Sequence, residues 1–386
     1  MNFELTQEQR LIQETARTFL ADNAGLQHLR TVLESGCGLD ETLWGALAGE
    51  MGFAGLMVPE AYGGTGLGAL ETALILEETG RTLAVVPFFE TAVLATQAIV
   101  LLGEPAQKQQ LLPAIAAGRT RAAFAMTGPG GAPYPQGVAI ELRYRTGDPV
   151  CRLHGTAEFV TFAHVADLLL VIARAPGSRG YEGLSLVAVP ATSPGIRIDR
   201  VPGLDLTRPF SRVTFDQVDV PTGSVLGPAG AAGEALDRVL AVGAGLLASE
   251  QTGGAAFCLA STVEYSKERV QFGRPIGSFQ AVKHELADMM VAVEAGRSAA
   301  LYAAAAIDAD TPELFEAASV ARVWCSEAFQ HCAAEAIQLH GGIGFTWEHH
   351  AHLYFKRARS SSTWLGEPVL HRERIAQLIG LQQVSA

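Results

Sequence analysis

Hydrophobic positions recur at helical spacing along the first part of the chain. Apolar side chains between residues 11 and 20 fall on one face of a helix. Thr6 stands at the N-cap position before this run, and Gln9 completes a capping box. A glycine-rich run at 58–68, VPEAYGGTGLG, interrupts the helical pattern and predicts a loop. We therefore expect an N-terminal α-helical domain over residues 1–120.

From residue 121 the helical period gives way to short β-branched or aromatic segments separated by Gly, Pro and Asp. This spacing favours a middle β domain over residues 121–228, built as an antiparallel barrel or sandwich. The expected strands lie at 121–126, 139–144, 159–161, 168–173, 184–189 and 213–215.

Beyond residue 228 the turn residues become rare and long helical patterns follow. The expected helices span 231–267, 279–308, 312–339 and 366–381. Because helices of about 30 residues joined by short connections pack as antiparallel neighbours, residues 229–386 predict an up-and-down four-helix bundle. The whole chain is expected to be an α+β protein.

Composition narrows the class of protein. Only 18% of the 386 residues are charged while 48% are hydrophobic, so much surface must be covered by other elements or subunits, and we expect an oligomer. The net charge of −12 argues against binding to nucleic acid or to an anionic membrane. Neither a signal-peptide pattern nor a continuous uncharged apolar run long enough to span a membrane is visible, so a cytoplasmic location is expected. The five scattered cysteines form no CxxC pair, and no metal site is predicted.

Two glycine-containing runs carry the chemistry. They are KERVQFGRPIGSFQ at 267–280 and QLHGGIGFTWEH at 338–349. Taken alone, each is most often a helix end or a turn. Together, and in this order on successive bundle helices, they resemble the flavin-binding signatures of the acyl-CoA dehydrogenase family, and the resemblance extends over the whole chain in the same α, β, α order.

The resemblance implies an FAD site. Arg269, Phe272 and Gln280 match the family's arginine turn, in which one subunit's arginine and glutamine reach the FAD of its neighbour. Arginine is a planar, permanently charged donor that suits a pyrophosphate, and glycines let backbone amides approach phosphate oxygens. The second half of this cradle comprises Gln338, Gly341, Gly342 and Gly344.

The middle region adds a weaker match. MTGP at 126–129 resembles the family's Thr-Glu-Pro turn, and the run 155–171 resembles the strand that packs against the flavin ring. By this resemblance Thr127 binds the cofactor, Phe159 lies near the isoalloxazine, and the Thr161 hydroxyl bonds flavin N5; an ordinary strand with a buried phenylalanine is the alternative. The family's small-Gly-Ser-Asp continuation is replaced by the residues at 131–134, which alters the loop expected to organise the cofactor or the CoA pyrophosphate.

Such enzymes remove the α-proton of an acyl thioester with a carboxylate while the β-hydrogen leaves as hydride to flavin N5. In this sequence the usual position of that glutamate carries Leu365, and the second known position carries Gly243. Glu250 lies two helical turns beyond Gly243 on nearly the same face, about 10 Å along the axis. We expect Glu250 to be the catalytic base; the alternative is that it bonds neighbouring groups and serves structure.

Other carboxylates and imidazoles are weaker candidates for the base. Glu367 lies two residues past the usual position and should point elsewhere. Glu77 and Glu78 are expected to be solvated, as glutamates on amphipathic helices usually are, and His340 is no stronger a candidate.

The sequence therefore predicts an oxidoreductase, an FAD-dependent acyl-CoA dehydrogenase. Gly243 and Gly245 leave volume on the helix, which favours a bulky acyl group such as a steroid side chain. The expected partners are the acyl-CoA substrate, an electron-transfer flavoprotein, and either further copies of this chain or a related chain in an α2β2 assembly. The alternatives are a non-catalytic partner subunit, and an oxidase or monooxygenase of the same fold.

Overall fold

The computed structural model describes residues 4–144 and 147–381. Helix α1 (Gln7–Asn23) begins as the sequence predicts. The Thr6 hydroxyl accepts a hydrogen bond from Gln9 N at 3.2 Å, and Gln9 Oε1 accepts one from Thr6 N at 3.0 Å. This reciprocal pair satisfies donors that the first turn of a helix leaves open.

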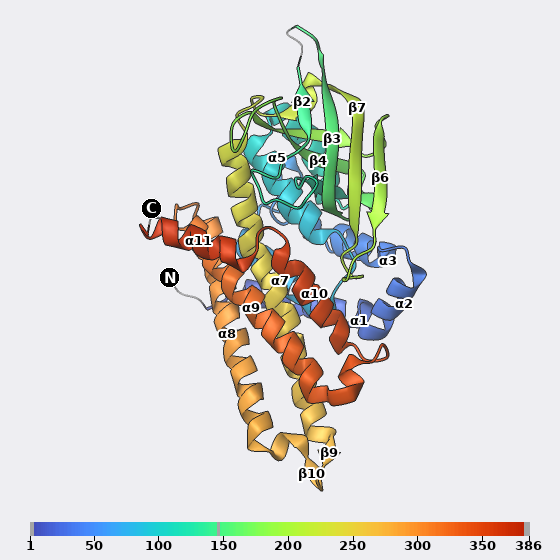
Figure 1. The fold of residues 1–386 in the computed structure, drawn as a ribbon, viewed down its shortest axis with the longest axis vertical. Coiled ribbons are helices and arrows are strands. Elements are labelled where there is room, and N and C mark those ends of the chain that lie inside the picture. The colour runs from blue at the N-terminus through green and yellow to red at the C-terminus, as the bar shows by residue number, and fades with distance from the viewer. Residues whose placement is uncertain (1–3, 145–146, 382–386) are drawn as a thin grey trace. The chain divides into compact units, whose positions relative to one another are not determined.

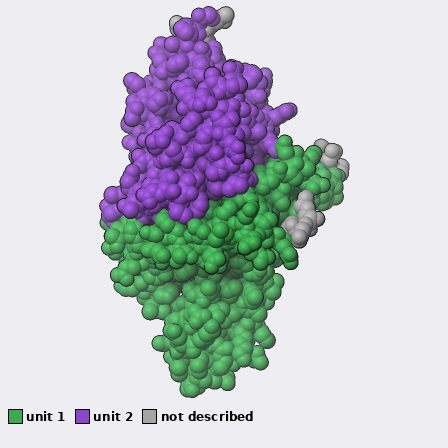
Figure 2. All heavy atoms as spheres, turned by 180° about the vertical axis from the view of Figure 1, so that it is seen from behind, with its two compact units in different colours: residues 1–34, 69–84, 243–386 green, residues 35–68, 85–242 purple. Residues whose placement is uncertain are grey.

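The described residues form two compact units (Figure 2). The first unit takes its residues from Met1–Glu34, Ala69–Ala84 and Gly243–Ala386, and the second from Ser35–Gly68 and Val85–Val242. The N-terminal helical residues are thus shared between the two units. The division into 1–120, 121–228 and 229–386 concerns sequence regions and stays a prediction.

The second unit contains a mixed β-sheet (Figure 1). Its strands run in the order β6-β7-β3-β2-β4-β5-β8, and β1 pairs with β4. The edge strands β6 and β8 do not pair with each other, so the sheet is open and the expectation of a closed barrel was wrong. It is not purely antiparallel either, because β1 and β2 both run parallel to β4. The strands are β1 (Ala122–Ala125), β2 (Glu141–Arg143), β3 (Val150–Thr161), β4 (Leu168–Arg174), β5 (Leu184–Pro190), β6 (Ile196–Val201), β7 (Phe210–Pro221) and β8 (Val225–Leu226).

Apolar side chains from these strands make the core of the second unit. Leu153, Leu169, Val187 and Phe215 are completely buried in one cluster. Short helices accompany the sheet, and the π-helix η4 packs against β1. The helical segments are α3 (Glu41–Trp44), η1 (Gly45–Glu50), η4 (Phe89–Ala95), α5 (Thr96–Leu102) and α6 (Pro105–Ala116).

The first unit is helical. Helices α8 and α9 run side by side with the later part of α7 (Figure 1), as the predicted bundle requires. Helix α10 was not predicted; it covers a stretch rich in arginine and serine. The helices are α1, α2 (Leu26–Ser35), α4 (Ala69–Thr82), α7 (Gly233–Glu268), α8 (Gln280–Asp308), α9 (Leu314–His340), α10 (Ala351–Thr363) and α11 (Pro368–Leu378).

Two glycines let α4 and α7 cross at very short distance. A Cβ on Gly80 would lie 1.9 Å from Glu250 O, and a Cβ on Gly253 would lie 1.8 Å from Glu77 O. No side chain fits at either position. The crossing fixes where Glu250 stands in the first unit.

Helix α8 is long and apolar enough to cross a membrane by length and composition alone. Its most apolar 18-residue window has a mean hydropathy of 1.2, and 39% of that window is buried. Bundle helices meet the same criterion, and Ala300 and Ala303 of α8 belong to the core of the first unit. The expectation that no membrane is involved stays a prediction.

Candidate functional site

The second unit brings together the two sequence segments that were expected to meet the flavin ring. Thr127 and Glu158 form an isolated β-bridge, in which Glu158 N donates to Thr127 O at 2.7 Å. The next residue, Phe159, is therefore beside the MTGP turn. Thr161, two residues further along β3, is buried.

Phe159 has an unusual backbone for an aromatic residue. Its φ is +55°, and its side chain is 49% exposed. A bulky residue at positive φ carries strain that is common at functional sites. The ring meets Phe210 edge to face, with centroids 6.1 Å apart, which leaves part of its surface open to a planar ligand.

The altered loop at 131–134 lies beside this ring. A Cβ on Gly131 would lie 3.7 Å from Phe159 Cε2. The Tyr134 hydroxyl donates to Gly233 O at 3.0 Å, and burial, followed by the charges of Tyr181 and Asp237, raises the pKa of Tyr134. The loop is thus held by a hydrogen bond from a tyrosine, whereas the family pattern has a serine and an aspartate in this loop.

In the first unit the arginine turn is a short hairpin between α7 and α8. Strands β9 (Val270–Gln271) and β10 (Arg274–Pro275) pair, and Ile276 N donates to Arg269 O at 2.8 Å. Phe272 sits at the tip with φ +53°, and its side chain is 92% exposed. Arg269 is exposed beside it, and Gln280 opens α8. Such exposure of a phenylalanine suits a residue that contacts another molecule.

The second motif follows the end of α9. Gln338 lies in the last turn of that helix, and the 3-10 segment η8 (Gly341–Phe345) begins immediately after it. Gly341 has φ +66° and ψ −145°, a conformation that favours glycine. Gly344 is packed closely, since a Cβ there would lie 2.8 Å from Ile337 O.

Tyr265 joins the two motifs. It stands four residues before Arg269 on α7, and its hydroxyl donates to His340 O at 3.3 Å. Its ring also stacks on the His340 ring, with centroids 4.3 Å apart. The glycine segment and the arginine turn therefore belong to the same end of the bundle.

The residues at this end fit a dinucleotide phosphate. Among the residues that the structure describes, nothing lies within 4 Å of a Cβ built on Gly341 or Gly342, so there is open space beside these two glycines, while the Gly341 amide itself donates to Gln338 O. An exposed arginine and an amide side chain are donors that suit pyrophosphate oxygens, and the absence of side chains at the glycines lets such a group approach the backbone closely. In the second unit the half-exposed Phe159 ring offers a surface for a flavin.

Glu250 is buried and paired. Its side chain is 6% exposed, and its Oε1 accepts a hydrogen bond from Arg357 Nη1 at 2.9 Å. Arg357 on α10 is equally buried, with 3% of its side chain exposed. A guanidinium at this distance stabilises the charged carboxylate.

Two of the weaker candidates for the base, Glu77 and Glu78, lie on α4. Glu77 and Glu78 are buried rather than solvated, so that expectation was wrong; Arg297 donates to Glu77, and Arg17 and Arg81 donate to Glu78. They are buried because the helix face that carries them contacts α1, α7 and α8.

The two remaining candidates lie on different elements. Glu367 is the exposed N-cap residue of α11. His340 is buried, and desolvation lowers its pKa.

A buried arginine network in the first unit was missed by sequence reasoning. Arg322 on α9 is fully buried; its Nη1 donates to Gln251 Oε1 at 3.1 Å, and its Nη2 donates to the carbonyls of Ser361 and Trp364 at 2.6 and 2.7 Å. Burial lowers the pKa of Arg322 to about 10. The signal was present in the sequence, because Arg322 interrupts the apolar face of its helix, four residues after Ala318.

Gly243 and Gly245 do not share an open face. Residues two apart project to different sides of a helix. A Cβ on Gly245 would lie 3.3 Å from both Ala318 Cβ and Ile307 Cδ1, so this glycine serves close packing against α8 and α9. The extra volume expected at Gly245 is absent.

Among the described residues, Glu285, His331 and Glu335 form a group that could hold a metal ion. Their ligand atoms lie within 4.8 Å of one another, and His331 Nε2 is 3.6 Å from Glu285 Oε1. Burial and the charge of Glu285 raise the pKa of Glu335. These side chains are exposed or half-exposed, and carboxylates there are readily solvated. The expectation of no metal stays a prediction.

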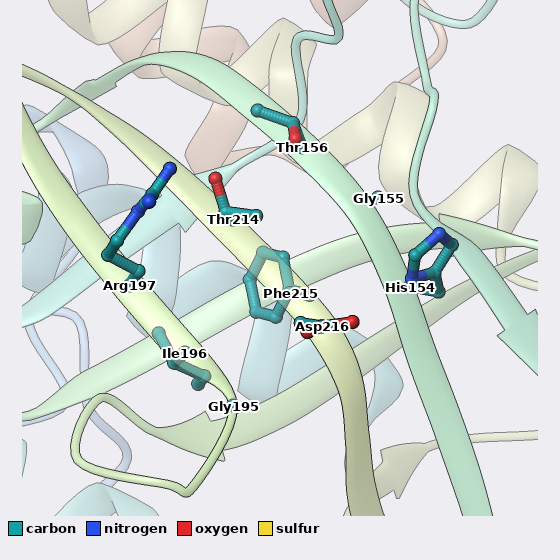
Figure 3. A pocket seen from close by; sticks show the side chains of 9 residues that line it. All are labelled: His154, Gly155, Thr156, Gly195, Ile196, Arg197, Thr214, Phe215 and Asp216. Carbon is teal, nitrogen blue, oxygen red and sulfur yellow. The ribbon is translucent and has the colours of Figure 1, made fainter.

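A hollow of about 440 Å³ lies on the sheet of the second unit (Figure 3). None of the predicted flavin-binding residues lines it, so this hollow is separate from the site described above. The lining residues come from β3, β7 and the start of β6, and they are His154, Gly155, Thr156, Gly195, Ile196, Arg197, Thr214, Phe215 and Asp216.

Comparison with known proteins identifies the family. Residues 6–119, 123–218 and 233–380 match the profiles of the acyl-CoA dehydrogenase N-terminal, middle and C-terminal domains. The chain belongs to the acyl-CoA dehydrogenase family. It is therefore an oxidoreductase, and its cofactor is FAD.

Two relatives share the name acyl-CoA dehydrogenase IpdE2. The protein from Mycobacterium tuberculosis is 35% identical over 94% of this chain and 94% of its own length. The protein from Mycolicibacterium smegmatis is 33% identical over 97% of this chain and 98% of its own length.

Solved structures share the fold at lower identity. PigA with FAD and proline has a TM-score of 0.91 and 26% identity, covering 99% of this chain and 100% of that one. A chain of the ChsE4-ChsE5 complex from Mycobacterium tuberculosis has a TM-score of 0.88 and 26% identity, covering 100% of both.

Proposed function

We propose that this chain catalyses the α,β-desaturation of an acyl-CoA thioester. The observation that carries the proposal is the pairing of the arginine turn with the Gly341–Gly342 segment through Tyr265 and His340, which leaves open space beside the two glycines at one end of the bundle. FAD, when bound, supplies the acceptor for the hydride that leaves the β-carbon.

The chain's own residues divide the remaining work. Arg269 and Gln280, with the Gly341–Gly342 backbone, hold the cofactor's phosphates and ribose side, each subunit serving its neighbour's FAD. Phe159 covers the flavin ring, Thr127 and Thr161 donate hydrogen bonds to it, and Phe272 packs at the edge of the dinucleotide.

We propose Glu250 as the base that takes the α-proton. Support comes from its burial at the α4–α7 crossing, since a carboxylate shielded from water is a stronger base. The Arg357 partner acts in the opposite direction because it stabilises the charged form. That contact supports the second candidate function, a partner subunit in which Glu250 is structural and the chemistry resides in a related chain.

Reductive bleaching tests both functions. The chain is purified alone, its flavin spectrum is recorded, and a panel of acyl-CoA thioesters is added without oxygen to the wild type, Glu250→Gln and Glu264→Gln. Glu264 is an exposed glutamate on the same helix and serves as the control. A self-sufficient dehydrogenase is yellow and bleaches, Glu264→Gln behaves like the wild type, and Glu250→Gln loses at least 100-fold in rate.

Other outcomes reassign the chemistry. Yellow protein that bleaches equally in both variants removes Glu250 as base. Protein that gains flavin and bleaches only after a related chain is added establishes the partner-subunit function in an α2β2 assembly. Oxygen consumption in place of stable bleaching indicates an oxidase or monooxygenase.

The proposal also covers the acyl group, the electron acceptor, the oligomeric state and the location of the enzyme. We propose a bulky acyl group, such as a steroid side chain. The argument from missing side chains now rests on the sequence at Gly243 alone, because Gly245 is packed. Electrons pass to an electron-transfer flavoprotein, and the enzyme is an oligomer in the cytoplasm. A faster reaction with straight-chain than with polycyclic thioesters would overturn the bulky substrate.

A further inference from the structure

Side chains from two neighbouring helices bind the backbone of the turn between α10 and α11. Trp364 O accepts from Arg322 Nη2 at 2.7 Å, and Gly366 O accepts from the same nitrogen at 3.3 Å. Leu365 O, between them, lies 3.0 Å from His371 Nε2. Three consecutive carbonyls of one turn are therefore bound by side chains from α9 and α11.

The donors are buried, so the cost of placing them there is high. Arg322 is fully buried and its pKa falls to about 10, because desolvation disfavours its charge. His371 is 8% exposed, and burial, followed by the charge of Arg322, lowers its pKa to about 4. The imidazole is thus neutral at pH 7, and because a carbonyl only accepts, its proton must lie on Nε2.

The residue at the centre of the turn is strained. Leu365 has φ +57°, a region that leucine enters only under constraint. Gly366 has φ +98°, and a Cβ there would lie 3.0 Å from His371 Nε2. Strained residues of this kind persist when their surroundings fix them, and they cluster at binding sites. The Leu365 side chain is half-buried, so part of it is accessible to a ligand.

The turn is also linked to Glu250. Gln251, the next residue on α7, accepts from Arg322 Nη1 and donates from Nε2 to Ser361 Oγ at 3.0 Å. Arg357, one turn before Ser361 on α10, holds Glu250. Two sets of hydrogen bonds, whose members are neighbours along α7 and α10, therefore hold the proposed base and the Leu365 turn.

We propose that Arg322 and His371 are positioning residues that lock the turn Trp364–Gly366, so that the Leu365 side chain forms a fixed apolar wall against the acyl group of the substrate. The inference rests on the proposed function for the identity of the ligand. The locking itself concerns this chain alone and is measurable without substrate.

The direct test is methyl NMR of Leu365 in the full chain. The resonance is assigned by its loss in Leu365→Val. His371→Met removes the donor to Leu365 O, whereas His371→Gln keeps an N–H donor near the same place. The wild type and His371→Gln should give one sharp pair of methyl signals, and His371→Met and Arg322→Lys should give broadened or doubled signals, because lysine cannot reproduce the arginine fork.

A matched control separates locking from general destabilisation. Phe329→Leu alters a buried residue of α9 that packs on Gly254, away from the turn. It should lower the unfolding midpoint while the Leu365 signals stay sharp. Unchanged Leu365 signals in His371→Met, or equal broadening in Phe329→Leu, would overturn the locking.

Kinetics then test the wall. His371→Met should raise the KM for the acyl-CoA substrate at least tenfold with kcat changed less than threefold, and His371→Gln should restore the wild-type KM. An unchanged KM in His371→Met overturns the role of Leu365 in binding. If no thioester reacts even with the wild type, the proposed function fails, while the NMR result still decides whether the turn is locked.

Discussion

At the residue scale, the buried Glu250–Arg357 pair should contribute measurably to stability. Both side chains are nearly inaccessible to water and their charged atoms are 2.9 Å apart. Arg357→Met should lower the free energy of unfolding by about 3–5 kcal/mol, because it leaves a buried carboxylate without its guanidinium. Urea unfolding measures this loss.

Two variants complete that experiment. Arg357→Met combined with Glu250→Gln should recover much of the stability, since neither member of the pair then carries a charge. Arg372→Met removes an exposed arginine paired with Glu327 and should cost about 0–1 kcal/mol. Equal losses in Arg357→Met and Arg372→Met would show that the buried pair contributes no more than a surface pair.

The flavin motifs could be predicted at this scale because their residues are adjacent in the sequence, and the roles of these residues stay predictions. Arg269, Phe272 and Gln280 all lie in one hairpin and its following helix. The roles of Arg322 and Arg357 could not be predicted in this way, because their hydrogen-bond partners lie on other helices and no local sequence pattern indicates those contacts. The Gly245 expectation failed for the same reason, because the side chains of α8 and α9 decide what occupies the space.

At the element scale, the close crossing of α4 and α7 depends on two glycines, one on each helix. Gly80→Ala and Gly253→Ala each place a Cβ within 2 Å of a carbonyl oxygen, so the helices must separate. Each substitution should cost about 1–3 kcal/mol or more in chemical unfolding. Gly45→Ala, with nothing within 4 Å and a right-handed conformation, should instead stabilise by about 0.5–1 kcal/mol.

The capping box of α1 should make a smaller contribution to the free energy of unfolding. Thr6→Ala removes the hydroxyl that accepts from Gln9 N, and should cost about 1 kcal/mol. Thr6→Ser keeps the hydroxyl and should stay within a few tenths of the wild type. A loss in Thr6→Ser as large as that in Thr6→Ala would argue against the capping box.

Elements with a repeating local pattern could be predicted, and pairings could not. The long bundle helices α7, α8 and α9 were expected within a few residues of their bounds, because their periodicity extends over many turns. The sheet was expected to be an antiparallel barrel or sandwich, because short alternating strands do not indicate which strands pair or in which direction. The parallel partners β1 and β4 are separated in the chain by β2 and β3, so no pattern of neighbouring segments indicates that they pair.

At the scale of the whole molecule, histidines that are held neutral set the response to acid. Desolvation, followed by the charge of Arg30, lowers the pKa of His350 to about 4, and Arg30 Nε donates to its Nδ1 at 3.2 Å. His371 also has a pKa of about 4. A free histidine titrates near pH 6.5, so between about pH 6.5 and 4 the unfolded chain binds more protons than the folded one.

Acid should therefore destabilise the folded chain. Stability contributed by these neutral imidazoles is fully present above about pH 6.5 and is lost as the pH falls towards 4. The urea midpoint should therefore drop between pH 7.5 and pH 5, before most carboxylates titrate, and His350→Gln should flatten that slope because glutamine does not bind the proton. An urea midpoint that stays constant from pH 7.5 to pH 5 would mean that folding does not exclude protons from these imidazoles.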